Sequence, residues 1–137
     1  MTRMLGNPAR AIALAEIDIK DLRLRTYVGF NPEEREKMQD VVINIHIAYA
    51  INEGIMADRV GSELNYKTIT KAVITHVEQG RFLLLEKLAF DVLDLCTSHA
   101  EVRRARVTID KPHALRFADS VSVTMRYDAN NPCGENS

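Results

Sequence analysis

The chain has 137 residues, of which 46% are hydrophobic and 27% charged, and its formal net charge is -1. These values suit one globular domain that buries roughly two-thirds of the surface its unfolded chain exposes. The balanced charge gives no reason to expect nucleic acid or an anionic membrane as partner, and no apolar run approaches the roughly 20 residues of a membrane span. Cys96 and Cys133 form no metal-binding or disulfide framework, so we expect no metal site and a cytoplasmic location.

The two ends of the chain differ in composition from its middle. Residues 1–15 have only a short, broken apolar run, which predicts a loose leader rather than a secretory signal. Residues 16–128 contain the periodic patterns and are expected to form a single domain. Residues 129–137 have turn composition and no apolar face, so we expect a disordered tail.

The first part of the expected domain contains two strand patterns. Glu16–Val28 alternates imperfectly, which predicts a strand with a bulge near Lys20–Asp21. Gly29–Met38 has Gly, Asn and Pro followed by charges, as loops do. Gln39–Ala50 alternates clearly, with β-branched residues on its apolar side. Together they predict a long antiparallel hairpin.

Two helices are expected in the middle of the chain. Residues 51–64 are polar and form the connection to the first helix. Asn65 is a favourable N-cap residue, and Gly80 is placed where a left-handed C-terminal cap is expected. A broad apolar stripe predicts the second helix from about Leu84 to Ser98.

Two more alternating runs, Val102–Asp110 and Ser120–Tyr127, complete the order ββααββ. This order predicts an α+β fold, with a four-stranded antiparallel sheet and two helices on one face. The other face is semi-polar, so it faces either water or the inside of a closed assembly of several sheets. Closure would also cover the exposed edges of a small sheet, and we therefore expect an oligomer. The semi-polar positions are Asn44, His46, Thr108, Ser122 and Thr124.

The connection between the last two strands is unusually polar. Within RVTIDKPHALRFADSVSV, the alternation is interrupted by a segment that contains Lys111, His113 and Arg116. This cluster is too polar for a plain hairpin turn, and we take Lys111 as the centre of a candidate site. The alternative is a solvated lysine at a strand end that pairs with Asp110, since most lysines are surface charges.

Four segments between Ile17 and Tyr127 resemble one known family. They are LRTYVGFNPEEREKMQDVVINI, LNYKTI, LLLEKLAFDVLD and VTIDKPHALRFADSVSV. In this order they are similar to the dihydroneopterin aldolases and the related dihydroneopterin triphosphate 2'-epimerases. The resemblance implies the tunnelling fold, in which the sheets of four chains close into a β-barrel with helices outside, and two such rings usually stack into an octamer. It also implies active sites between neighbouring chains that bind a pterin without a metal or bound cofactor.

The resemblance assigns three catalytic roles. Lys111 matches the family's catalytic lysine, and a lysine in a partly dry interface can exchange protons near neutral pH. Tyr66 matches a tyrosine that a neighbouring chain supplies, with Leu64 beside it, and its phenol can relay a proton. Glu34 matches the loop glutamate by its position after Gly29, and it can hold a water or a substrate hydroxyl. The adjacent glutamates of the EERE run leave a shift of one residue open.

Glu86 matches the family's pterin anchor. A carboxylate at a helix start can accept two hydrogen bonds from the aminopyrimidinone edge of a pterin, and Leu85 is expected to add a backbone contact. An acid in the first helical turn is also favoured by the helix macrodipole, by about 0.3–1 kcal/mol. Both roles are compatible.

The resemblance leaves two activities open. Both begin with loss of the 2'-hydroxyl proton and retro-aldol cleavage of the C1'–C2' bond. Release of the aldehyde gives 6-hydroxymethyl-7,8-dihydropterin and glycolaldehyde, whereas rotation and readdition give the 2'-epimer. Val28 stands where many aldolases have a histidine, and DKPHALRFADSVSV resembles the epimerase branch. A non-catalytic pterin- or purine-binding oligomer is an alternative from another class.

A triphosphate substrate would need cations at the mouth of the site. Arg116, Lys37 and Arg35 are the candidate phosphate contacts, and His113 is a further candidate for substrate binding. A lone loop histidine is more often structural or solvated than functional.

Overall fold

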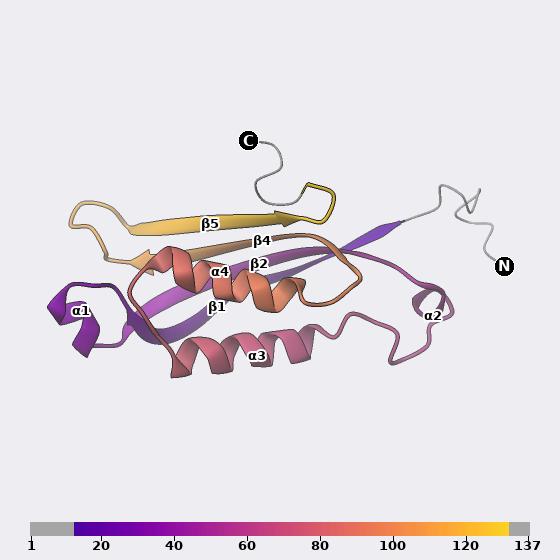
Figure 1. Ribbon diagram of the computed structural model, residues 1–137, viewed down its shortest axis with the longest axis horizontal. Coiled ribbons are helices and arrows are strands. Elements are labelled where there is room, and N and C mark those ends of the chain that lie inside the picture. The colour runs from indigo at the N-terminus through magenta and orange to yellow at the C-terminus, as the bar shows by residue number, and fades with distance from the viewer. Residues whose placement is uncertain (1–12, 132–137) are drawn as a thin grey trace.

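The computed structural model describes residues 13–131. Most of the predicted leader and tail therefore lies outside the described residues. The strands are β1 (Leu14–Val28), β2 (Gln39–Ala50), β3 (Arg81–Phe82), β4 (Val102–Pro112) and β5 (Ser120–Asp128). The helices are α1 (Pro32–Glu36), α2 (Glu53–Met56), α3 (Tyr66–Gln79) and α4 (Leu85–Thr97) (Figure 1). No helix in residues 13–131 is long and apolar enough to cross a membrane.

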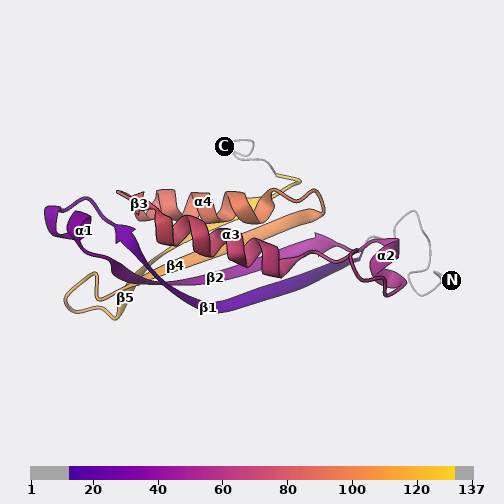
Figure 2. The same ribbon diagram turned by 90° about the horizontal axis from the view of Figure 1, so that it is seen from below.

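The strands form one mixed sheet in the order β3-β1-β2-β4-β5. The predicted antiparallel pairs β1–β2, β2–β4 and β4–β5 are all present. The prediction of four strands was incomplete, because β3 adds a short parallel pairing to the end of β1. Two residues are too few to show alternation in a sequence. The helices α3 and α4 lie on one face of the sheet (Figure 2).

The predicted bulge in β1 is confirmed. The pairing of β1 with β2 shifts between Ile19 and Leu22, and Asp21 has a positive φ of 52°. The side chain of Asn44, on β2, accepts a hydrogen bond from the Asp21 backbone N–H at 2.9 Å. The bulge therefore has a side-chain partner for its otherwise unpaired backbone.

Both predicted connections contain a short helix. In the first, α1 begins with a capping box between Asn31 and Glu34. In the second, the Asn52 side chain caps α2 by accepting from the Ile55 N–H at 2.8 Å. Helices of one turn cannot show a 3.6-residue apolar period, so the pattern predicted loops in both places.

The hydrophobic core lies between the sheet and the two long helices. Helix α3 contributes Ile69, Val73 and Val77, and α4 contributes a broader apolar stripe. Cys96 of that stripe is fully buried, and burial raises the pKa of its thiol to about 12. The strand residues that face them are buried and mostly β-branched: Val41, Ile43, Ile45, Ile47, Val107 and Ile109.

The ends of α3 agree only in part with the caps predicted from the sequence. Asn65 caps the start as predicted, accepting from the Thr68 N–H at 3.0 Å. The prediction of a left-handed Gly80 was wrong, because its φ is -96° and its ψ is 168°. A glycine suits this position because an added Cβ would lie 2.5 Å from the Phe82 ring. Gly80 thus allows close packing of the chain as it turns into β3.

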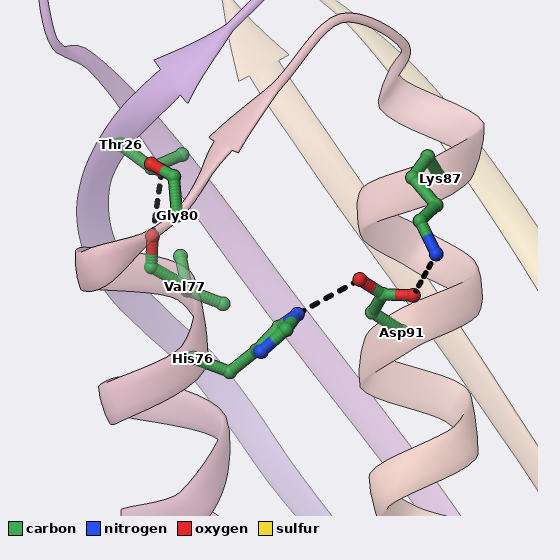
Figure 3. Close-up of polar contacts among 6 residues, drawn as sticks. All are labelled: Thr26, His76, Val77, Gly80, Lys87 and Asp91. Atoms are coloured by element: carbon green, nitrogen blue, oxygen red, sulfur yellow. Dashed lines mark hydrogen bonds and ion pairs between the residues drawn. The ribbon is translucent and has the colours of Figure 1, made fainter.

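A buried threonine ties the end of α3 to the sheet. The hydroxyl of Thr26, on β1, donates to the Val77 carbonyl at 2.6 Å and lies 3.3 Å from the Gly80 carbonyl (Figure 3). The final carbonyls of a helix lack partners within the helix. Thr26 therefore satisfies part of that deficit inside the core.

Helices α3 and α4 are joined by a polar cluster. Asp91 accepts from Lys87 and contacts the His76 ring nitrogen Nε2, both at 2.8 Å (Figure 3). Burial alone would raise the pKa of Asp91, but the hydrogen bonds from Lys87 and His76 outweigh it and hold the pKa below its usual value. This cluster orients the two helices.

Candidate active site

The structure pairs Lys111 with Glu34. Lys111 lies near the end of β4 and is only 9% exposed, and its Nζ donates to Glu34 Oε2 at 2.5 Å. The alternative of a solvated lysine paired with Asp110 is wrong, since Asp110 instead accepts from the Ser120 hydroxyl at 3.4 Å. An amine and a carboxylate in contact at a partly dry position can share and transfer a proton.

The environment of Glu34 favours its charged form. The hydrogen bond from Lys111 lowers the pKa of this carboxyl, burial opposes that effect, and the Asn31 backbone N–H and the Lys111 charge lower it further. The Asn31 N–H donates to Glu34 Oε1 at 3.3 Å. One carboxylate oxygen therefore faces the lysine and the other faces the start of α1.

A glycine makes room for this carboxylate. Gly29 follows β1 and has a φ of 133°, and an added Cβ would lie 2.1 Å from Glu34 Oε1. Its N–H donates to the Phe82 carbonyl on β3 at 2.9 Å. From the sequence, Gly29 was used only to locate Glu34 in the loop. In the structure, Gly29 also makes room for the Glu34 carboxylate, which packs against it.

Tyr66 lies away from the ion pair. It is the first residue of α3, is 48% exposed, and lines a groove of about 610 Å³ beside Ile17 and Ile19 of β1. The described residues that line this groove include neither Lys111 nor Glu34. Within one chain, Tyr66 and Lys111 therefore do not form one site.

Leu64, just before α3, is 2% exposed and its side chain belongs to the core. Any contact of Leu64 with a substrate would have to use its backbone.

Glu86 and Leu85 are the first two residues of α4. Glu86 is exposed, so its carboxylate is open to a ligand at the helix start. The N-cap residue Leu84 forms no side-chain capping hydrogen bond. The first backbone N–H groups of a helix need partners, and a polar ligand edge or water can supply them.

The turn between β4 and β5 contains both remaining candidates. His113 has a positive φ of 62°, and its N–H donates to the Asp119 carbonyl at 3.2 Å. Arg116 is exposed and lies 5.4 Å from the ring centre of Phe117, which is itself 94% exposed. His113 is two positions from Lys111, whereas Arg116 lies in the middle of the turn. The other candidate phosphate contacts are also exposed: Arg35 lies in α1, and Lys37 directly follows it.

The sheet face opposite the helices has an ordered distribution of charge. One row across the sheet pairs Asp18 of β1 with His46, His46 with Arg106, and Arg106 with Arg126 of β5. His46 lies 2.8 Å from both Asp18 and Glu16, which also belongs to β1. Along this row, the β1 end is therefore acidic and the β5 end is basic.

The arrangement suits proton transfer. Within residues 13–131, no group of three or more His, Cys, Asp or Glu side chains is placed to hold a metal ion. The reactive features are an ion pair at one end of the sheet and an open carboxylate at a helix start. Fold and site together define a small α+β enzyme suited to acid–base chemistry.

Comparison with known proteins identifies the family. A family model described as dihydroneopterin aldolase (FolB) matches residues 17–126. The chain belongs to this family. Dihydroneopterin triphosphate 2'-epimerase of Pseudomonas aeruginosa is 50% identical over 112 residues, which are 82% of this chain and 91% of that protein. Dihydroneopterin aldolase of Haemophilus influenzae is 30% identical over 105 residues, 77% of this chain and 89% of that protein.

A solved structure agrees with the fold. The crystal structure of Escherichia coli dihydroneopterin aldolase in complex with neopterin matches with a TM-score of 0.75 and 28% sequence identity. The match covers 82% of this chain and 98% of that chain. The epimerase is therefore closer to this chain in sequence, and the fold of the chain matches that of a solved aldolase.

Proposed function

We propose that the chain is a dihydroneopterin triphosphate 2'-epimerase, which converts 7,8-dihydroneopterin triphosphate to 7,8-dihydromonapterin triphosphate. The observation that decides between the branches is the 50% identity to a curated epimerase, against 30% to an aldolase. The pairing of Lys111 with Glu34 supports acid–base chemistry in either case. Cytoplasmic localisation and the absence of a cofactor stay predictions.

The reaction needs a base, an electron acceptor and a site that retains the aldehyde fragment. The base takes the proton of the 2'-hydroxyl, the C1'–C2' bond breaks, and its electron pair enters the C=N unit of the dihydropterin. The aldehyde rotates and adds back to C1' through its other face, and the 2'-oxygen takes up the proton again. We assign the proton transfers to Lys111, which takes the hydroxyl proton as the neutral amine and returns it as the ammonium, with Glu34 holding the lysine and a substrate hydroxyl or water. The 2.5 Å contact between them supports this assignment.

We assign pterin binding to Glu86. Its exposed carboxylate at the start of α4 can accept two hydrogen bonds from the aminopyrimidinone edge. Leu85 would add a backbone contact, and Leu64 would do the same from the chain that supplies Tyr66. His113 and the exposed cations Arg116, Lys37 and Arg35 are the proposed contacts to the side chain and its phosphates.

The complete site requires a neighbouring copy. Tyr66 lies beside β1, and Lys111 pairs with Val121 on β5, so the two residues belong to opposite sides of the sheet. A ring that places β1 of one copy beside β5 of the next would bring these sides together. The charge row supports this order, because acidic Asp18 would meet basic Arg126. We therefore propose a barrel of four sheets, alone or stacked in pairs.

Product analysis tests the function. The purified protein is incubated with 7,8-dihydroneopterin triphosphate and, separately, with 7,8-dihydroneopterin, and the oxidised pterins are separated by chromatography. Monapterin from the triphosphate with little hydroxymethylpterin is the expected result. Rapid hydroxymethylpterin from the free compound would make the chain an aldolase. No turnover of either compound would favour a pterin-binding oligomer.

A further inference from the structure

The helix that contains Glu34 has no apolar anchor. Helix α1 (Pro32–Glu36) buries no residue, so packing into the core does little to fix its position. A hollow of about 370 Å³ also lies beside α1, lined on one side by residues of α1 and on the other by the end of β1 and by β3. The position of α1 therefore depends on polar contacts.

Strand β3 supplies two of these polar contacts. The Phe82 carbonyl accepts from the Gly29 N–H at 2.9 Å, at the start of the loop. The Nη1 of Arg81 donates to the carbonyl of Arg35, the residue after Glu34, at 3.0 Å. The last carbonyls of a helix have no partner within the helix, and Arg35 is close to the end of α1. The Arg81 guanidinium thus provides the hydrogen bond that this carbonyl lacks.

The Arg81 guanidinium is itself held in place. It lies 3.8 Å from the centre of the Tyr27 ring, and the two residues are partners in the parallel pairing of β3 with β1. A planar guanidinium can stack on an aromatic ring and donate hydrogen bonds from its edge at the same time. Strand β3 is anchored in turn by Phe82, which is buried and packs edge-on against the His76 ring, with ring centres 5.6 Å apart. A fixed donor therefore reaches α1 from the folded core.

We propose that Arg81 is a positioning residue, which fixes the backbone of α1 from β3 and so holds the Glu34 carboxylate against Lys111. The lysine is fixed separately, because its strand β4 is paired with β5 at Val121. A shift of α1 relative to the sheet would therefore open the contact between Lys111 and Glu34. In this role Arg81 acts through the Arg35 backbone. The kinetic part of this inference rests on the proposed function.

Loss of the guanidinium should affect chemistry more than binding. Without it, α1 can shift toward the hollow, whereas Glu86 at the start of α4 keeps its place. A misplacement of about 1 Å costs up to roughly 100-fold in rate. The Lys111 hydrogen bond is the largest cause of the lowered pKa of Glu34, so loss of this contact should also raise that pKa.

The test compares Arg81→Met with Arg103→Met. Methionine keeps an unbranched apolar side chain and removes the guanidinium. Arg103 forms the same kind of bond, to the Ala100 carbonyl at 2.7 Å, and lies at the opposite end of β4 from Lys111. For Arg81→Met we expect kcat for the triphosphate to fall by roughly 10- to 100-fold, with KM changed by less than about threefold. Arg103→Met should match the parent protein in both constants.

A second measurement does not depend on turnover. The Glu34 carboxyl is titrated by ¹³C NMR in the parent protein, in Arg81→Met and in Arg103→Met, and Glu34→Gln identifies its signal. We expect its pKa to rise in Arg81→Met and to stay unchanged in Arg103→Met. If Arg81→Met does not fold, Arg81→Lys, which keeps the charge and lacks the planar fork, is measured in its place, with changes expected in the same directions.

The outcomes separate the two proposals. An unchanged kcat and an unchanged Glu34 titration in the Arg81 variant would overturn the positioning role. A raised KM without either change would also overturn it, because Arg81 would then act on the substrate itself. If the parent protein turns over no pterin, the proposed function fails, and the NMR titration still decides the role of Arg81. A fall in kcat matched by an equal fall in the folded fraction, with the titration unchanged, would show that Arg81 acts only on stability.

Discussion

Lys111 and Glu34 are 77 positions apart in the chain and form an ion pair between the end of β4 and the helix α1. The lysine side chain is 11% exposed and the glutamate side chain 25% exposed. A pair at this degree of burial is protected from solvent on one side and open on the other. That is the situation in which a proton can pass between protein and substrate.

Replacement of Lys111 should remove activity while leaving the chain folded. For Lys111→Ala we expect turnover to fall by at least about 100-fold, because the main proton-transfer group is lost. The measurement is monapterin formation at saturating substrate, with circular dichroism as the check of folding. Lys20→Ala, at an exposed site in the β1 bulge, is the control and should keep its activity. Near-normal turnover in Lys111→Ala would remove this lysine from the mechanism.

The Glu34 carboxylate should make stability depend on pH. Its pKa is lowered in the folded protein from an ordinary value of 4.5, chiefly by the Lys111 hydrogen bond. A lowered pKa gives stability that is present above the ordinary value and lost as the pH falls through the folded value. We expect Glu34→Gln to unfold about 1–3 kcal/mol more easily at neutral pH, with the difference shrinking below about pH 4.

Urea unfolding over a series of pH values measures this difference. The control is Glu33→Gln, because Glu33 is the exposed neighbour of Glu34 in α1. It should show no comparable change. A Glu34→Gln difference that stays constant from neutral to acidic pH would contradict the assignment.

Two glycines with positive φ separate backbone strain from crowding of the site. Gly29 has a φ of 133° and packs against Glu34, whereas Gly61 has a φ of 102° and no atom of the described residues within 4 Å of an added Cβ. Both alanine variants should lose about 1 kcal/mol or more of stability from strain. Only Gly29→Ala should also displace the carboxylate and lower kcat by at least about 10-fold.

Thermal unfolding and turnover are measured for both glycine variants. A normal kcat in Gly29→Ala would show that the carboxylate can move without loss of function. An equal loss of kcat in Gly61→Ala would show that strain, and not crowding, is responsible.

The hydroxyl of Thr26 should contribute more to stability than the volume of the side chain does. Thr26→Val keeps the shape of the side chain and leaves the Val77 and Gly80 carbonyls without this buried donor. We expect a loss of about 1–3 kcal/mol in the free energy of unfolding, measured in urea. Thr70→Val is the matched control, because the Thr70 hydroxyl donates to the Tyr66 carbonyl within an exposed part of α3. Equal effects at the two sites would contradict the importance of burial.

Charge reversal at the sheet edge tests the proposed ring. Arg126→Glu places an acid where acidic Asp18 of the next copy is expected, so the assembly should dissociate more easily at low salt. Light scattering after size exclusion measures the assembly. Asp18→Arg combined with Arg126→Glu should restore it, whereas Arg59→Glu, in an exposed turn away from the sheet, should have no effect. An unchanged assembly in Arg126→Glu would argue against this order of strands.

The sequence alone was sufficient to predict the long strands and helices. Gln39–Ala50 was located to the residue, because a strand with one buried face must alternate its side chains. Asn65 was sufficient to locate the start of α3, because its side chain caps the first turn. The family could also be read from ordered segments, and the matching family model confirms it.

Short elements and long-range contacts depended on the tertiary structure. The strand β3 and the helix α1 are too short to have a period. Gly80 looked like a left-handed cap, and only packing against Phe82 explains its extended backbone. Lys111 and Glu34 were both candidates from the sequence, but their pairing was not predicted, because Glu34 reaches Lys111 only when the β1–β2 hairpin is paired with β4. Local pattern specifies which segments form, whereas the pairing of distant strands decides which side chains meet.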